Sequence, residues 1–372
     1  MSNFLFVTGL VILAHIYPVD SDNRAIPDSN LKMGQHVRVL FWNVENLFDY
    51  HDDTTTIDEE FTGAGAMHWT YSKLRRKLAH VAKTILAAGA WNPPGIIGFC
   101  EVENRYVLNK LVYDSPLKPF HYRIIHRNSP DRRGIDVAIL YRETIFNPTY
   151  SEWISIQFPF DTIVKTRDIL YVKGVLHHTD TIHLFVNHWP SRRGGEKVSA
   201  PKRNYVASVL RQKADSILRT AKQYGTRDLR YANRESLIAY PYILIMGDFN
   251  DEPDNESLCT ILRAGHPDTT ENPSGLVNLM YPKLHLEGSH KFRDHWGLLD
   301  QFITSGSLVM GETNLRIDPG SVTIYKPDFM MKDDIKYLGN KPNRTFLGPR
   351  YLGGFSDHLL IYLDIRIRDK SH

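Results

Sequence analysis

The feature that most constrains the fold of this 372-residue chain is the segment YILIMGDFND, residues 242–251. Its first five residues are large and mostly apolar, which predicts a buried strand that ends at Gly247. Side chains two positions apart on a strand point to the same face, so Asp248 and Asn250 would project together from a rigid strand end. Such a placement suits chemistry, but Gly, Asp and Asn are also ordinary turn residues. The segment alone leaves both interpretations open.

The composition is that of a globular protein with a substantial core. Hydrophobic residues make up 42% of the chain and charged residues 23%, which are ordinary values for a soluble domain. The net charge of +3 is compatible with a polyanionic substrate, but it is far from the charge of a pure nucleic-acid-binding protein. The two cysteines, Cys100 and Cys259, form no Cys-x-x-Cys pattern, so we expect neither a structural zinc site nor a disulfide scaffold.

The N-terminal segment has the layout of a secretory signal peptide. An apolar stretch over residues 4–17 is too short to span a bilayer and gives way to polar residues 20–24. No Lys or Arg precedes it and no small-x-small cleavage site follows, so a first core strand or an uncleaved anchor stays open. We predict a signal peptide or N-terminal apolar segment over residues 1–25. The expected location is periplasmic or secreted, and otherwise cytoplasmic, without stable membrane insertion after residue 25.

The rest of the chain, residues 36–370, is predicted to form a single domain of many strands and a few helices. Period-two and short apolar runs predict strands at residues 37–42, 96–100, 135–141, 169–175, 182–187, 242–246, 299–304 and 359–367. Helical periodicity covers residues 71–88 and 199–222. This pattern indicates an α/β or α+β layered domain. Residues 224–240 and 319–351 look like surface excursions.

Several predicted strands end in polar residues that can handle a metal ion or a phosphate. They are Asn43, Glu45, Glu101, His188, Asp248, Asn250, Asp357 and His358, and Asp300 lies within an apolar stretch. Each has a structural alternative: Asn43 could cap a turn, Glu101 could be an exposed acid, and His188 could be a core histidine. Asp300 is harder to explain in that way, because burying a carboxylate costs several kcal/mol unless it is paired or metal-bound. We therefore interpret the set as one site.

In their order and spacing these residues resemble the motifs of the endonuclease/exonuclease/phosphatase superfamily, which has the pancreatic-DNase-like fold. The matching segments are Trp42-Asn43-x-Glu45, Glu101, Asn187-His188, Gly247-Asp248-Phe249-Asn250, Asp300 and Ser356-Asp357-His358. The resemblance covers residues 36–367 and is greatest to the bacterial exported nuclease-like branch. It implies a four-layer α-β-β-α sandwich, in which two packed mixed β-sheets have helices outside. The site would lie at one edge, where loops from both sheets meet.

The resemblance also implies a metal centre. Glu101 matches the principal carboxylate ligand of a Mg²⁺ ion, and Asn43, Glu45 and Asp357 match positions that hold or surround the ion. Ligation by oxygen alone suits Mg²⁺ or Mn²⁺. The cofactor expected from the sequence is therefore Mg²⁺, with Mn²⁺ as an alternative.

Five further residues would carry the reaction according to the same resemblance. Asp248 would orient and deprotonate the attacking water, and Asn250 would hold the scissile phosphate or that water. His358 would contact the phosphate, while Asp300 fixes its tautomer and raises its basicity. His188 would donate to the phosphate or the leaving oxygen. Together they imply metal-assisted, in-line hydrolysis of a phosphate ester.

Basic and aromatic residues near these motifs bear on the substrate. Arg133 resembles a family position beside the site and is expected to contact phosphate. Arg192 and Arg193 lie on a glycine-rich loop after His188 and suit a polyanion backbone, although they could be solvated surface charge. Three aromatics could stack on bases or be structural; they are Trp189, Trp296 and Tyr351.

The sequence therefore predicts a monomeric metal-dependent phosphodiesterase, most simply an endonuclease that acts on DNA or RNA. A phosphomonoesterase or a lipid or inositol phosphate phosphodiesterase would share every core residue, because fold and core site do not fix the substrate. The inositol-polyphosphate branch is disfavoured, because residues 294–300 lack its Pro-x-Trp-Cys-Asp-Arg signature. For the sphingomyelinase branch, no exposed apolar hairpin stands out after residue 36. A non-catalytic binding module is disfavoured because no core residue is missing.

Overall fold

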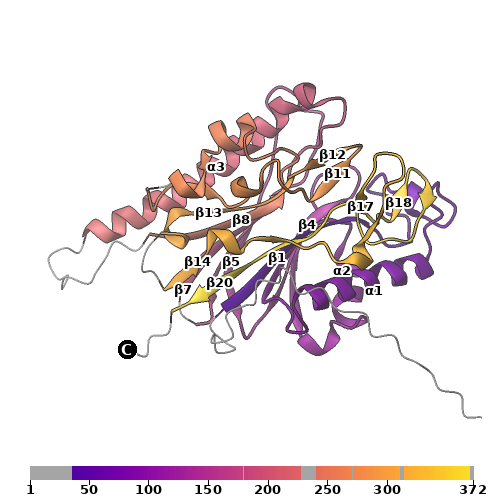
Figure 1. Cartoon of the computed structure of the whole chain (residues 1–372), viewed down its shortest axis with the longest axis horizontal. Helices are drawn as coiled ribbons and strands as arrows, with labels where there is room; N and C mark the ends of the chain where they lie inside the picture. Colours follow the sequence, from indigo (N-terminus) through magenta and orange to yellow (C-terminus); the bar gives the residue numbers. More distant parts are fainter. Residues whose placement is uncertain (1–35, 179, 228–239, 270, 311–313, 369–372) are drawn as a thin grey trace, which may run out of the picture. The chain divides into compact units, whose positions relative to one another are not determined.

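Two mixed β-sheets form the frame of the computed structural model, which describes residues 36–178, 180–227, 240–269, 271–310 and 314–368 (Figure 1). These residues belong to one structural unit, Gly34–His372. The predicted signal peptide and most of the predicted excursion at 224–240 lie outside the described residues. None of the helices within the described ranges is long and apolar enough to cross a membrane.

The first sheet is built around β1, which carries Asn43 and Glu45. Its strand order is β14-β20-β1-β2-β4-β3, and β15 also pairs with β20. The bounds are β1 (His36–Leu47), β2 (Ile96–Val102), β3 (Tyr122–His126), β4 (Asp136–Arg142), β14 (Leu315–Ile317), β15 (Thr323–Ile324) and β20 (Ile361–Ile367). Because β1 and β2 run parallel, their carboxyl ends meet at the same edge of the sheet.

The second sheet is built around β8, the apolar run that ends at Asp248. Its strand order is β5-β6-β7-β8-β13-β10-β9. The bounds are β5 (Phe146–Ile154), β6 (Ile169–Leu176), β7 (Asp180–His188), β8 (Tyr242–Asp248), β9 (Ala264–Gly265), β10 (Leu276–Asn278) and β13 (Asp300–Ser305). In this sheet β7 and β8 run parallel, so their carboxyl ends also coincide.

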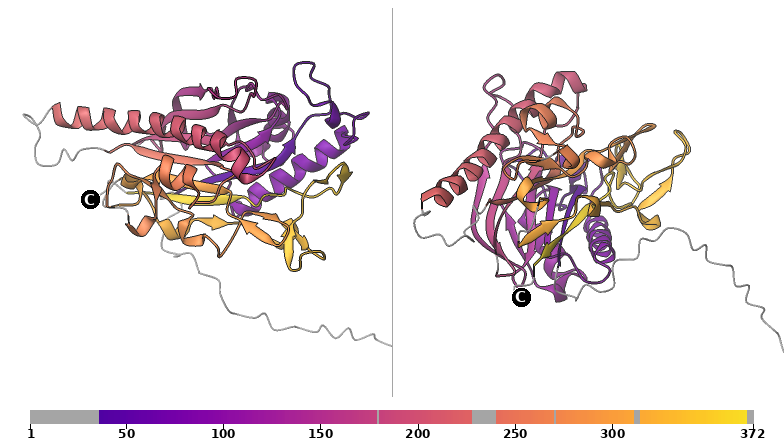
Figure 2. Two further views of the ribbon diagram at one scale, coloured as in Figure 1. Left: turned by 90° about the horizontal axis from the view of Figure 1, so that it is seen from above. Right: turned by 60° about the vertical axis from the view of Figure 1, so that its left-hand side comes forward.

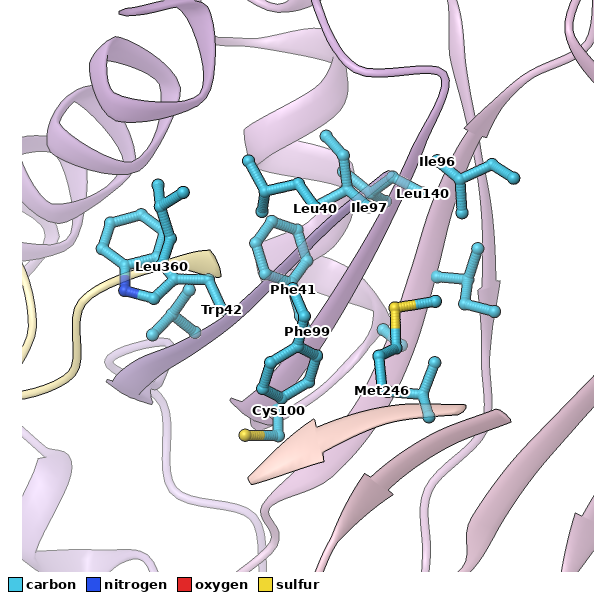
Figure 3. Close-up of a cluster of buried hydrophobic side chains, with 14 of the residues drawn as sticks. Leu40, Phe41, Trp42, Ile96, Ile97, Phe99, Cys100, Leu140, Met246 and Leu360 are labelled. Atoms are coloured by element: carbon cyan, nitrogen blue, oxygen red, sulfur yellow. The ribbon is translucent and has the colours of Figure 1, made fainter. Parts of the chain in front are cut away.

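The sheets pack face to face through large apolar side chains. Phe41 and Phe99 of the first sheet and Met246 of the second belong to one buried core (Figure 3). The fit is close at Gly98, where an added Cβ would lie 2.7 Å from the Met246 sulfur. Only glycine leaves this space in the first sheet, so the close approach of the two sheets accounts for the Gly in β2.

Helices cover the outer faces of both sheets (Figure 2). On the first sheet lie α1 (Tyr71–Ala88) and α2 (Arg105–Tyr113), and the apolar stripe of α1 is buried in the same core as β1. The second sheet is covered by α3 (Glu196–Arg227), whose Ala207 and Leu210 pack in a separate core with Ile243 and Ile245 of β8. The expected four-layer α-β-β-α sandwich is confirmed.

Three two-stranded hairpins extend beyond the sandwich. They are β11 (His290–Phe292) with β12 (His295–Gly297), β16 (Met331–Asp333) with β17 (Asn340–Pro342), and β18 (Phe346–Leu347) with β19 (Arg350–Tyr351). Short helical turns occur at Glu59–Phe61, Lys118–Phe120, Ser257–Ile261, Pro267–Thr269, Tyr281–Lys283, Gly306–Leu308, Pro319–Ser321 and Asp328–Met330. The predicted excursion at 319–351 therefore has its own secondary structure, and β17 contacts β11.

Candidate active site

The register of the second sheet places three predicted catalytic residues in one row. His188 at the end of β7 pairs with Asp248 at the end of β8. Asp300 at the start of β13 pairs with Asp248 from the other side. Since paired residues of neighbouring strands lie about 5 Å apart, the sheet itself brings an imidazole and two carboxylates together.

Gly247 and Asn250 show that the Gly-Asp-Phe-Asn segment is both a strand end and a turn. A Cβ on Gly247 would lie 2.6 Å from both the Cβ and the carbonyl oxygen of Asn187, so the parallel partner strand excludes a side chain there. Asn250 has a left-handed φ of 52°, and its backbone N–H donates to Asp248 Oδ1 at 2.9 Å. The turn thus holds the Asp248 carboxylate through the backbone N–H of Asn250.

The first sheet contributes Asn43 and Glu101 from its two central strands. Asn43 is fully buried and its amide donates to Glu101 Oε1 at 3.1 Å and to Asp248 Oδ2 at 3.0 Å. Glu101 Oε2 accepts the backbone N–H of Asn46 at 2.9 Å. Both Glu101 and Glu45 have positive φ angles, 62° and 50°. Such backbone costs on the order of 1–3 kcal/mol per residue and concentrates at functional sites.

His358 and Asp300 form a buried pair beside Asp248. His358 Nδ1 lies 2.7 Å from Asp300 Oδ2, and its Nε2 lies 3.8 Å from Asp248 Oδ2. Burial disfavours the charged imidazolium, but the charges of Asp300 and Asp248 outweigh it, and the pKa of His358 is raised well above its usual value. Asp300 also accepts a hydrogen bond from Ser289 Oγ at 2.5 Å. The charges of Asp300 and Asp248 therefore favour the protonated form of His358.

Asp248 and His188 have the opposite protonation tendencies. Burial raises the pKa of Asp248 to about 7, with His358 opposing and Asp300 adding to the shift. Burial, followed by the charges of Arg167 and Arg133, holds the pKa of His188 well below its usual value, although its Nε2 lies 3.8 Å from both Glu101 Oε1 and Asp248 Oδ2. Asp248 thus lies between two imidazoles whose pKa values are shifted in opposite directions, His358 upward and His188 downward.

The Glu45 carboxylate accepts hydrogen bonds from the segment 344–346. Its carboxylate accepts the backbone N–H groups of Thr345 at 2.6 Å and Phe346 at 3.3 Å, and Arg344 Nε at 3.3 Å. Burial and then the neighbouring Asp357 raise the pKa of Glu45 to about 7. The left-handed backbone at Glu45 turns the side chain toward residues 344–346 and away from the row at β8. Glu45 therefore surrounds the centre and anchors this segment.

The oxygen donors that remain fit a hard divalent cation. Asn43, Glu101 and Asp357 supply carboxamide and carboxylate oxygens, the ligand types that Mg²⁺ and Mn²⁺ prefer. Arg344 links Asp357 to Glu45, because it donates to Asp357 Oδ2 at 2.8 Å and to Glu45 Oε1 at 3.3 Å. By contrast, two groups of ligand atoms lie within 4.8 Å of one another and contain nitrogen or sulfur. They are Cys100, His188 and Asp248, and Asp248, Asp300 and His358.

The three predicted substrate-binding arginines have different environments. Arg133 has a half-exposed side chain, pairs with Asp131 at 3.3 Å, and depresses the pKa of His188. Arg192 is engaged in the fold, because it donates to the Asn250 carbonyl at 2.7 Å and to Asn255 Oδ1 at 2.8 Å. Exposed Arg193 lines a cavity of about 600 Å³ next to the site. The charge of Arg193 is therefore available to a substrate, whereas Arg192 holds the loop after β8.

Several residues of the site were not identified from the sequence. Buried Arg167 donates to the His188 carbonyl at 3.2 Å and to the Trp189 carbonyl at 2.6 Å. The His290 ring lies 4.6 Å from that of His358, and burial followed by the charge of His358 lowers the pKa of His290 to about 4. Arg344 comes from the excursion, whose sequence gives no motif. These residues act through tertiary contacts that no local pattern reveals.

The expectation that Trp189 could stack on bases is wrong. Its side chain is 1% exposed and packs edge-on against Phe249. It also donates to Asn187 Oδ1 at 3.2 Å. Trp189 is a core residue. Trp296 and Tyr351 are partly buried against the core.

Comparisons with known proteins agree with this geometry. Residues 38–367 match the model of the Endonuclease/Exonuclease/phosphatase family, and the chain therefore belongs to this family of phosphoester hydrolases. A search of curated proteins finds no significant match.

Solved structures show the same fold at low sequence identity. An endonuclease/exonuclease/phosphatase family protein from Bacteroides thetaiotaomicron has 12% identity and a TM-score of 0.52, with 90% of this chain and 98% of that chain covered. The human Nocturnin catalytic domain has 16% identity and a TM-score of 0.51, with 90% and 95% covered. A mannosyl-6-phosphatase from B. thetaiotaomicron has 13% identity and a TM-score of 0.50, with 88% and 99% covered.

Proposed function

We propose that this protein is a divalent-metal-dependent phosphodiesterase that acts as an endonuclease on DNA or RNA. The observation that carries the proposal is the environment of Asp248. Its Oδ2 accepts a hydrogen bond from the Asn43 amide at 3.0 Å and lies 3.8 Å from Nε2 of both His188 and His358. A buried carboxylate with a pKa of about 7 is suited to accept a proton from water near neutral pH.

Each residue has a role that follows from its contacts. Asp248 accepts the proton of the attacking water. The imidazolium of His358 contacts an anionic phosphate oxygen and stabilises the charge that develops there. Neutral His188 lies beside Asp248, and its Nε2 faces the Asp248 carboxylate. Asn43, Glu101 and Asp357 would hold Mg²⁺, which would supply Lewis-acid stabilisation of the phosphate when bound.

Nucleic acid is the substrate best supported by the surroundings of the site. The adjoining cavity of about 600 Å³ contains Arg193 together with the aromatic side chain of Phe292, which is 64% exposed. A cation beside an exposed ring suits a strand whose phosphates are neutralised while its bases stack. A chain with the predicted signal peptide would act in the periplasm or outside the cell; a mature N-terminus that begins at Met1 or Ser2 would contradict this location.

A lipid phosphodiester is the second candidate, and one feature favours it. The turn between β16 and β17 exposes Ile335 at 91% and Leu338 at 78%. No apolar hairpin tip was expected here, because these residues lie among Lys, Asp and Gly. Exposed apolar side chains beside basic ones suit a membrane interface.

A substrate panel tests the proposal. Purified protein is assayed with Mg²⁺, Mn²⁺ or EDTA on plasmid DNA, RNA, bis-p-nitrophenyl phosphate, phosphoinositides and mannose 6-phosphate. We expect cleavage of DNA or RNA and of the model diester that EDTA abolishes. Hydrolysis of phosphoinositides alone would support the lipid candidate, and hydrolysis of mannose 6-phosphate alone would contradict a phosphodiesterase.

A further inference from the structure

A second cavity adjoins the site, and seven of its sixteen lining residues are basic. Its volume is about 730 Å³, and it shares Arg344 and Asp357 with the metal centre. Seven basic residues line it, namely Lys291, Arg293, Lys332, Lys336, Lys341, Arg344 and Arg350. Three carboxylates oppose them, namely Asp333, Asp334 and Asp357. The cavity lining therefore has a strong positive charge in a chain whose net charge is only +3.

The carboxylates neutralise only part of this charge. Asp334 pairs with both Lys291 at 3.1 Å and Lys341 at 2.8 Å, and Asp357 pairs with Arg344 at 2.8 Å. Across the described ranges of the chain, the structure records no ion pair for Lys332 or for exposed Arg350. These two cations are free to neutralise an anion that enters the cavity.

The hairpin places Lys332 in an unfavourable position. Lys332 on β16 is paired directly with Lys341 on β17, and like charges directly opposite each other destabilise a strand pair. Burial and then the charges of Lys341 and Arg344 lower the pKa of Lys332. An anion bound between these side chains would relieve the repulsion, which gives a physical reason for two facing lysines.

The two cavities lie on either side of one strand. In β11, His290 lines the cavity that contains Arg193, Lys291 lines the cationic cavity, and Phe292 lines both. A substrate at the metal centre can therefore continue in both directions past Phe292. A nucleic-acid strand continues in both directions from its scissile phosphate, whereas a lipid headgroup ends on one side.

We propose that the cationic cavity binds the phosphate next to the scissile phosphate of a nucleic-acid strand, and that Lys332 and Arg350 are its specificity-determining contacts. The inference rests on the proposed endonuclease activity and adds a second phosphate-binding subsite to it. It implies that a strand with flanking phosphates is processed better than a diester with one phosphate. Phe292 then stacks on a base between the two cavities.

The test compares two substrates in the Lys332→Gln/Arg350→Gln double variant. One substrate is a single-stranded oligonucleotide and the other is bis-p-nitrophenyl phosphate, which has one phosphate. We expect kcat/KM to fall at least tenfold more for the oligonucleotide than for the model diester. The slope of log(kcat/KM) against log[salt] for the oligonucleotide should become shallower by about 0.7, since each neutralised phosphate of a single strand contributes about 0.7.

A matched control is Lys118→Gln. Lys118 is an exposed lysine on the helical turn Lys118–Phe120 that precedes β3, at the end of the first sheet opposite the site. This variant should leave kcat/KM unchanged for both substrates. Unchanged melting temperatures would show that every variant folds.

Three outcomes separate this inference from the proposed function. Equal losses on both substrates, or an unaltered salt slope, would overturn the cavity assignment while the phosphodiesterase remains. If the double variant lost activity only toward phosphoinositide vesicles, the nucleic-acid assignment would be overturned. The cavity would then bind a phosphorylated lipid headgroup instead. A wild-type protein that hydrolyses no phosphodiester at all would contradict the proposed function itself.

Discussion

Replacing Asp300 by Asn tests whether the buried pair with His358 supports catalysis. The substitution removes a fully buried charge that lies 2.7 Å from His358 Nδ1 but keeps the side-chain shape. Two opposite charges about 4 Å apart attract by about 4 kcal/mol at an effective dielectric constant of 20. If His358 must be an imidazolium in the transition state, this loss corresponds to about three powers of ten in rate.

The assay is kcat/KM for bis-p-nitrophenyl phosphate at saturating Mg²⁺ across a pH series. Because Asp300 raises the pKa of His358, Asp300→Asn should also move the alkaline limb of the profile to lower pH. Ser289→Ala is the matched control, since it removes a neutral hydrogen bond to the same carboxylate and should cost only about tenfold. A folded Asp300→Asn variant whose kcat/KM stays within tenfold of wild type, with an alkaline limb at the same pH, would show that the Asp300 charge does not support catalysis through His358.

Three further predictions concern positioning and stability. Arg167→Met should lower the free energy of unfolding, measured by chemical denaturation, by about 3–5 kcal/mol, because it removes an ion-pair partner of the buried Asp131 carboxylate. A loss below about 1 kcal/mol would contradict this prediction. Burial lowers the pKa of His183 to about 4, so the unfolded chain binds its proton first and stability falls as pH drops from about 6.5 to 4. In melting curves recorded across this pH range, His183→Gln should reduce the pH dependence of stability by the equivalent of about one proton. A pH dependence identical to that of wild type would contradict this prediction. Gly247→Ala should cost about 1–3 kcal/mol because its Cβ meets the partner strand, whereas Gly320→Ala, which meets only a contact at 3.4 Å, should stay within about 0.5 kcal/mol.

The layered fold could be predicted because its central strands and α1 are defined by local patterns. The apolar stripe at Leu74, Leu78 and Val81 predicted α1 at its observed bounds, Tyr71–Ala88. Strands β3 and β5 were missed. In β5, most residues are only partly buried or exposed, so its sequence shows no clean alternation, and tertiary pairing with β6 fixes it instead.

The candidate site could be predicted only where its residues lie at strand ends. Asp248, His188 and Asp300 meet because of register, which the apolar runs specify. Glu45 was expected to hold or surround the metal, and its metal ligation stays a prediction; its interaction with the 344–346 segment depends on a long-range contact that no spacing encodes. The same holds for Arg344, which arrives from an excursion with no motif.

In the proposed mechanism, Asp248 accepts a proton from the water that attacks the phosphodiester. The most direct measurement is the single-turnover rate of oligonucleotide cleavage by wild type and Asp248→Asn, each titrated with Mg²⁺. We predict that wild-type cleavage rises with Mg²⁺ and stops with EDTA, and that Asp248→Asn lowers the rate at least about 100-fold with an unchanged melting temperature. A folded Asp248→Asn variant that cleaves at a rate near that of wild type would contradict the account.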